Sequence, residues 1–308
     1  MRAKLLFLAE KPEYQEGMRL AQEMLSELAV AFSHSFLMRE KLLDGEPAQQ
    51  ELLEMAGDHD AVVLFGSESF ADQFAAEMSC FAGMIQAKRP ETISELSRLK
   101  EGNIPAVDFI WPISDQSAVI SKTAVTACAH AKKRGQNIVL SHNDVTKDWE
   151  TAVNRAAMYA ALPSPFILPL HDVMNTVLFQ PEHPFVVLAC ADEKSLLNSL
   201  LCFMSGTELL QHTCYVSDQL RLHAVVPPVS QQGVPLFSAL YAAAGAIRES
   251  LSLEQEADCL ETAIDNVLAS GWRTPEFGMW PKTISHEEAL RLVVEQVHLA
   301  GELMEKLH

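Results

Sequence analysis

Two consecutive helical patterns fill the stretch PLFSALYAAAGAIRESLSLEQEADCLETAIDNVLASGWRT, residues 235–274. In the first, apolar residues recur at helical spacing with small residues between them, which predicts a closely packed helix over 235–249. In the second, Ser252 and Gln255 have the spacing of a capping box, and Gly271 stands where a left-handed residue ends a helix. We therefore expect a helical hairpin, 235–249 and 254–269, buried in a core.

Short apolar strands alternate with helices along the rest of the chain, which favours an α/β sheet covered on both faces. The expected strands are 4–9, 60–66, 104–113, 137–141, 166–170, 185–190, 213–216 and 221–226. The expected helices outside the hairpin lie at 18–32, 122–133, 149–160, 172–179 and 196–204, with a last one that begins at Ser285. Gly135 is expected to end the helix at 122–133.

Composition excludes several classes of function. The 308 residues include 41 Asp and Glu against 23 Lys and Arg, a net charge of −18, which argues against nucleic-acid binding. No apolar run reaches the roughly 18 residues of a membrane helix, and the apolar start of the chain stops at Glu10, too early for a signal peptide. The six cysteines contain no C-x-x-C pair, so we expect reduced thiols and a cytoplasmic protein.

The hairpin also resembles a known family. LSLEQEAD (251–258), Ala263, Ile264 and GWRT (271–274) are similar, in order and in register, to the C-terminal signature of the isopropylmalate/isocitrate dehydrogenases. The stretch from Ala129 to Val139 resembles that family's helix-to-strand segment. The resemblance implies two α/β domains with a discontinuous large one: 1–95 plus 220–308 on the cofactor side, and 96–219 as the smaller, dimerising domain.

Enzymes of this family oxidise a 2-hydroxy acid and decarboxylate it with NAD or NADP and Mg²⁺ or Mn²⁺, which acts as a Lewis acid. The resemblance implies the same cofactors here. The family's catalytic lysine falls at His142, within His142-Asn-Asp-Val145. An imidazole there could act as a base near neutral pH, although a loop histidine without a role is the alternative.

The family's first metal aspartate falls at Asp172, whose alternative role is the N-cap of the next helix. The remaining metal carboxylates of the family lie on the helix after the following strand, in a pattern like G-D-x-x-x-D. Without gaps these positions fall on Leu196 and Leu200, and a one-residue slip gives Ser195 and Ser199, so neither register supplies an acid. Asp192 and the adjacent Glu193 follow the strand directly and form either a relocated metal site or a solvated loop.

The substrate clamp and the cofactor loop also depart from the family pattern. Arg98 matches one clamp arginine, whereas the next motif reads Asn103-Ile-Pro105 without its arginine, and the segment with the catalytic tyrosine is missing. His223-Ala-Val-Val-Pro-Pro228 stands in place of H-G-S-A-P-D, without its glycine and its acid. His223, Gly233 and Val234 are the candidate cofactor-binding residues.

Two functions remain open. One is a divergent NAD(P)-dependent dehydrogenase of a small 2-hydroxy acid, and the other is a catalytically eroded homologue that binds or regulates. For both we expect a homodimer, because helices 172–179 and 196–204 carry more apolar surface than one core needs, and a small carboxylate as ligand. Since most of the family's catalytic positions are unmatched, we predict no NAD reduction with isopropylmalate or isocitrate.

Overall fold

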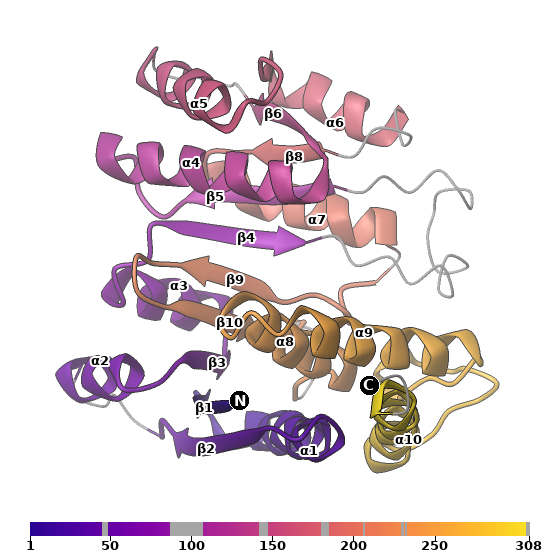
Figure 1. Cartoon of the computed structure of the whole chain (residues 1–308). Coiled ribbons are helices and arrows are strands. Elements are labelled where there is room, and N and C mark those ends of the chain that lie inside the picture. The colour runs from indigo at the N-terminus through magenta and orange to yellow at the C-terminus, as the bar shows by residue number, and fades with distance from the viewer. Residues whose placement is uncertain are drawn as a thin grey trace.

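In the part of the chain that the structure describes, the fold is a ten-stranded sheet with helices on both faces (Figure 1). The computed structural model describes residues 1–44, 49–86, 107–141, 147–179, 185–205, 207–228, 231 and 233–305. The strands are β1 (Arg2–Ala9), β2 (Ser35–Leu42), β3 (Ala61–Phe65), β4 (Ala82–Gln86), β5 (Val107–Pro112), β6 (Asn137–Ser141), β7 (Phe166–Leu168), β8 (Phe185–Leu188), β9 (Thr213–Val216) and β10 (Arg221–Val225). The helices are α1 (Gln15–Ala31), α2 (Gln49–Gly57), α3 (Glu68–Glu77), α4 (Ser117–Arg134), α5 (Lys147–Ala160), α6 (Leu170–Phe179), α7 (Lys194–Ser205), α8 (Leu236–Glu249), α9 (Glu254–Ala269) and α10 (His286–Glu305).

The strand order, β2-β1-β3-β10-β9-β4-β5-β8-β6-β7, joins two parallel blocks that run in opposite directions. β2, β1, β3 and β10 are parallel to one another, and so are β5, β8, β6 and β7. β9 pairs antiparallel with both β10 and β4, and β4 pairs antiparallel with β5. The carboxyl ends of the two blocks therefore lie at opposite edges of the sheet.

Helices cover the two faces unequally. On one face, α1, α8, α9 and α10 pack on β1 and β3, while α4 and α5 form a second apolar cluster on β5, β6 and β8. On the other face a single cluster runs under α2, α3, α6 and α7. Figure 1 shows α3 and α7 on this second face, on opposite sides of β4 and β9.

The helical hairpin lies where its sequence predicts. α8 and α9 pack against each other, and their buried residues share one cluster with β1 and β3, which confirms that prediction. Gly271 follows the end of α9 with a φ of 81°, and Gly135 ends α4 with a φ of 65°, both in the left-handed region that glycine favours.

The predicted starts of two helices are corrected by the structure. Leu253, not Ser252, is the N-cap of α9; Ser252 has a φ of 57°, and α9 has no side-chain cap. Asp172 is not the N-cap of α6 either, because α6 begins two residues earlier, at Leu170. In contrast, the amide of Glu288 donates to Ser285 Oγ at 3.2 Å, as predicted for the start of α10.

The division of the chain into two domains, with boundaries at residues 95/96 and 219/220, stays a prediction. One sheet runs through the whole described chain.

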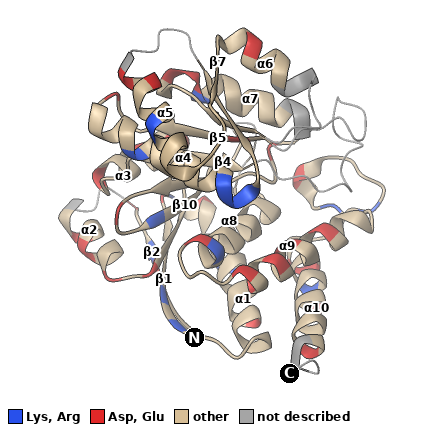
Figure 2. Cartoon of the chain, turned by 45° about the horizontal axis from the view of Figure 1, so that its top comes forward, with Lys and Arg blue, Asp and Glu red and all other residues tan. Residues whose placement is uncertain are grey.

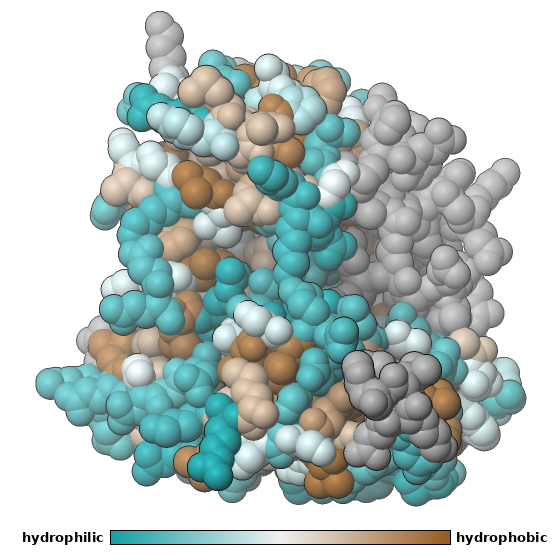
Figure 3. Space-filling model, viewed as in Figure 1, coloured by the Kyte–Doolittle hydropathy of each residue, from teal (hydrophilic) through white to brown (hydrophobic). Residues whose placement is uncertain are grey.

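All six cysteines are free thiols, and burial raises the pKa of Cys80 to about 12. No helix in the described ranges combines the length and the apolar composition that crossing a bilayer requires. Acidic residues occur along α1, α2 and α9 (Figure 2), and the face seen in Figure 3 mixes polar and apolar residues.

Candidate functional site

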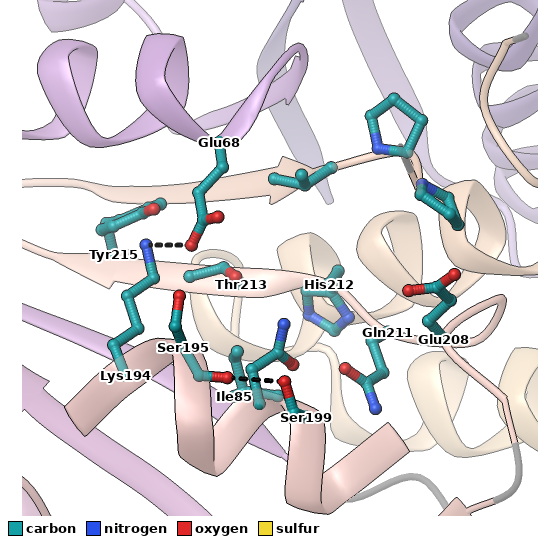
Figure 4. A pocket seen from close by; sticks show the side chains of 14 residues that line it. Glu68, Ile85, Lys194, Ser195, Ser199, Glu208, Gln211, His212, Thr213 and Tyr215 are labelled. Carbon is teal, nitrogen blue, oxygen red and sulfur yellow. Dashed lines mark hydrogen bonds and ion pairs between the residues drawn. The ribbon is translucent and has the colours of Figure 1, made fainter. Parts of the chain in front are cut away.

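A pocket of about 230 Å³ opens between α3 and α7, over β4 and β9 (Figure 4). Polar side chains from both helices and from the segment before β9 line it, and apolar residues close it at the ends of β4 and β10. The lining residues are Glu68, Ile85, Lys194, Ser195, Asn198, Ser199, Glu208, Gln211, His212, Thr213, Tyr215, Val226, Pro227 and Pro228. Segments that lie far apart in the sequence therefore meet in one concave site.

Lys194, in the first turn of α7, bridges the two helices that flank the pocket. Its ammonium group lies 2.7 and 2.8 Å from the two carboxylate oxygens of Asp72 and 3.0 Å from Glu68 Oε1, both on α3. The Lys194 side chain is only 11% exposed, whereas the two carboxylates are nearly half exposed. The ammonium group therefore donates two hydrogen bonds to Asp72 and forms an ion pair with Glu68.

The floor beneath Lys194 is aromatic. The ammonium group lies 5.3 Å from the ring centroid of Trp111, and Tyr215 contacts Trp111 edge to face. The Tyr215 hydroxyl donates to Asp72 Oδ1 at 2.6 Å. Burial, together with the negative charge of Asp72, raises the pKa of Tyr215 well above its usual value, so this phenol stays protonated at neutral pH.

One face of α7 presents hydroxyl and amide groups to the pocket. Ser195 and Ser199 lie one turn apart, and Ser199 Oγ donates to the backbone oxygen of Ser195 at 2.9 Å. Asn198 lies between them, and its Oδ1 is buried without a hydrogen-bond partner. An unsatisfied buried acceptor costs about 1–3 kcal/mol, so Asn198 is suited to receive a donor from a bound molecule.

At the other end of the pocket, the segment before β9 contributes Glu208, Gln211 and His212 (Figure 4). His212 packs beside His223, with ring centroids 5.9 Å apart. Both rings lie against Gly245 of α8, where an added Cβ would come within 2.6 Å of His212 Nε2. The glycine therefore makes room for this imidazole at the pocket wall.

The sequence-predicted metal residues lie outside the pocket. Asp172 is half exposed on α6, beside His171, and Asp192 is exposed in the 3₁₀ turn Ala191–Glu193. Both follow the carboxyl ends of strands in the same parallel block, β7 and β8, and therefore lie toward the same sheet edge. Glu193 is buried instead, accepting hydrogen bonds from Ser141 Oγ and from the amide of Cys190. His142 and Arg98 lie outside the described residues.

The predicted cofactor residues lie at the two ends of α8: Gly233 and Val234 precede its first turn, and His223 contacts Gly245 and Ser250 near its last turn. His223 is fully buried in β10 and faces α8; burial, above all, lowers the pKa of its imidazole, which is therefore neutral at pH 7. Val234 is buried over Gly17, while Gly233 has a φ of 97°. Of the predicted cofactor loop, Val226, Pro227 and Pro228 line the pocket. The roles of His223, Gly233 and Val234 in binding a cofactor stay predictions.

Comparison with known proteins identifies the fold. No family model and no curated protein matches the sequence. Among solved structures, the chain is similar to isocitrate dehydrogenase from Methylococcus capsulatus, with a TM-score of 0.80 and 11% sequence identity, over 96% of this chain and 99% of that chain. The fold is therefore isocitrate dehydrogenase-like, as the resemblance of the hairpin predicts.

The pocket does not fit the divalent metal that such a fold implies. Mg²⁺ and Mn²⁺ prefer carboxylate oxygens, but α7 offers the hydroxyls of Ser195 and Ser199, and the carboxylates nearest to Lys194 are occupied by its ammonium group. Within the described ranges, no three His, Cys, Asp or Glu side chains gather as a metal site. We derive no metal-dependent step for this chain.

The pocket is also a poor fit for a dinucleotide. Its volume of about 230 Å³ lies below the roughly 300–1,000 Å³ of sites for drug-sized ligands. Pro227 and Pro228, which line it after β10, have no backbone N–H to offer a pyrophosphate. The described part of the site suits a smaller molecule.

Proposed function

We propose that this chain binds a small polar molecule in the pocket between α3 and α7 and has lost metal-dependent oxidation of 2-hydroxy acids. The observation that carries this proposal is the pocket face of α7, where hydroxyl and amide side chains replace the carboxylates of the resembled family. Lys194 reinforces it, because its ammonium group pairs with the carboxylates of Asp72 and Glu68, which could otherwise bind a divalent cation.

Loss of the metal would remove several kcal/mol of transition-state stabilisation, which corresponds to orders of magnitude in rate. We therefore expect no reduction of NAD or NADP with isocitrate or isopropylmalate, with or without Mg²⁺ or Mn²⁺. Turnover above about 1 s⁻¹, a typical lower value for a working enzyme, would contradict the proposal.

Binding is tested by blocking the pocket. Ser199 is exposed on α7, so Ser199→Trp is expected to fill the pocket without unfolding the helix. Ser121→Trp is the matched control, because Ser121 Oγ of α4 donates to Ser117 one turn back at 2.8 Å, as Ser199 does to Ser195. A set of small amines, alcohols, amino acids and carboxylic acids is screened by saturation-transfer NMR. We expect at least one signal that Ser199→Trp abolishes and Ser121→Trp keeps; signals equally strong in both variants would refute the proposed site.

A second candidate function is an active dehydrogenase with relocated chemistry, in which Asp172, Asp192 and His142 would carry the reaction in place of the pocket residues. The sheet topology supports it, because β7 and β8 belong to the same parallel block, and Asp172 and Asp192 follow their carboxyl ends. Arg98 would then bind a substrate carboxylate. The test is NADH or NADPH formation with a panel of 2-hydroxy acids, and loss of that activity in Asp192→Asn would separate this candidate from the first.

A further inference from the structure

We propose that the pocket between α3 and α7 selects a small ammonium-bearing molecule rather than a di- or tricarboxylate. This inference rests on the proposed function and names the ligand class of the same site. Three observations on the described residues carry it: the pairing of Lys194 with two carboxylates, an uncompensated carboxylate at the opposite end, and a buried acceptor between them.

The lysine cannot serve as an anion receptor in this arrangement. The Lys194 ammonium group already donates to both carboxylate oxygens of Asp72, at 2.7 and 2.8 Å, and forms an ion pair with Glu68 at 3.0 Å. These two carboxylates carry more negative charge than one ammonium group neutralises. A ligand carboxylate would have to displace one of them and would meet the charge of the other, so this end of the pocket disfavours anions.

The opposite end carries a second negative charge. Glu208 lines the pocket and is exposed, and no lysine or arginine among the described residues pairs with its carboxylate. Its neighbours on the pocket wall, Gln211 and His212, come from the same segment, which runs along the side facing α7 (Figure 4). A ligand ammonium group could form a charge-assisted hydrogen bond with the Glu208 carboxylate.

The centre of the pocket offers amide oxygens that can accept hydrogen bonds from a ligand. Among the described residues, Asn198 Oδ1 has no hydrogen-bond partner, and Gln211 Oε1 receives only the weak donor of the Cys202 thiol at 3.6 Å. The hydroxyls of Ser195 and Thr213 can donate or accept. With two carboxylates and two amides around it, a ligand rich in N–H or O–H groups satisfies more of the site than one that only accepts.

Three probes of similar length and different charge test this ligand class: 1,4-diaminobutane, 1,4-butanediol and succinate. Binding to the full chain is measured by saturation-transfer NMR and by thermal shift at about 150 mM salt, where charges more than about 8 Å apart are largely screened. We expect the diamine to bind at least tenfold more tightly than the diol, and succinate to bind more weakly than either.

Variants distinguish binding of the diamine in the pocket from non-specific binding to the acidic surface of the protein. Glu208→Gln is expected to weaken diamine binding about tenfold, whereas Glu302→Gln, which neutralises an exposed carboxylate of α10, leaves it unchanged. Asn198→Leu tests the central acceptor and is expected to weaken diamine and diol alike. Equal losses in the Glu208 and Glu302 variants, or no diamine binding at all, would overturn the proposal.

The same experiment distinguishes this inference from the proposed function. If succinate or butanediol binds more tightly than the diamine and Ser199→Trp abolishes that binding, the pocket is a ligand site and only the ligand class is wrong. If Ser199→Trp leaves the binding of every probe intact, the proposed site itself fails.

Discussion

The ring of Trp111 occupies the space that a side chain at Gly83 would need: a Cβ on Gly83 would lie 2.4 Å from two ring carbons of the indole. The two residues are paired across β4 and β5, and the indole supports Lys194 from below. The absence of a side chain at Gly83 thus makes room for the indole that packs against the Lys194 ammonium group.

Gly83→Ala is therefore expected to destabilise the protein by about 1–3 kcal/mol, the usual cost of overpacking a core, because the fully buried Trp111 cannot move away freely. Gly57→Ala is the control: nothing lies within 4 Å of a Cβ there, at the end of α2, so it should be neutral or slightly stabilising. Urea unfolding of both variants measures the difference, and equal stabilities would show that the sheet adapts without cost.

The ion pair across the pocket is expected to couple α3 and α7. Lys194→Met and Asp72→Asn should each lower stability, and a double-mutant cycle should give a coupling energy of about 1 kcal/mol, reduced from that of a buried pair because Asp72 is nearly half exposed. The exposed pair Arg291 and Glu295 on α10 serves as the control cycle, with an expected coupling of about 0.3–0.5 kcal/mol. A Lys194–Asp72 coupling no larger than this control would mean that Lys194 does not hold the two helices together.

The raised pKa of His286, in α10, predicts how the stability of the protein depends on pH. The hydrogen bond to Glu276 is the largest cause that raises the pKa of His286, to about 9, from the usual 6.5. Because the folded value is the higher one, this contribution is fully present below about pH 6.5 and is lost as the pH rises through about 9. His286→Gln should flatten the loss of stability between pH 6.5 and 9, measured by urea unfolding, while His298→Gln, a more exposed pair with Glu27, should leave its slope unchanged.

Glu276 is the acidic counterpart of this pair. Burial, its largest influence, opposes ionisation, yet the hydrogen bond and charge of His286 lower its pKa overall. Its contribution to stability is therefore present above its unfolded value of about 4.5 and is lost as the pH falls below that. The carboxylate also accepts a hydrogen bond from the amide of Leu236, at the start of α8, so acid should loosen this helix.

The sequence predicts the fold better than the site, for physical reasons. The hairpin follows from local periodicity and from Gly271, which needs no distant partner. The sequence analysis does not predict β2 or β4. β2 is an edge strand with polar residues on both faces, so it lacks an apolar pattern, and β4 has only five residues, one of which is Gly83. The Lys194–Asp72 pair joins residues 122 positions apart, and only the packing of α3 and α7 brings them together. Ser195 and Ser199 could be found by counting, because a helix keeps its register.

The expected homodimer stays a prediction with a direct test. Leu197, Leu200 and Leu201 are buried beneath α7, but Leu196 is 44% exposed and extends the apolar surface of this helix outward. Leu196→Glu should shift a dimer toward monomer, measured by light scattering at micromolar concentration. Val125→Glu, at a 59% exposed site on α4, is the control and should leave the mass unchanged. A wild-type chain that is already monomeric would contradict the prediction.

Finally, the pocket face of α7 should be convertible to a metal site if the loss of carboxylates is what excludes a metal. Ser195→Asp with Ser199→Asp places two carboxylates one turn apart on the pocket wall, where oxygen ligands suit Mg²⁺ and Mn²⁺. We expect at least a tenfold gain in Mn²⁺ affinity over the wild type, measured by isothermal titration calorimetry, and a further gain when Lys194→Met removes the competing charge. Ser117→Asp with Ser121→Asp, the same spacing on α4, controls for two added acids on a helix of an acidic protein. Equal Mn²⁺ affinities in the two pairs would show that the pocket contributes nothing to metal binding beyond the two charges.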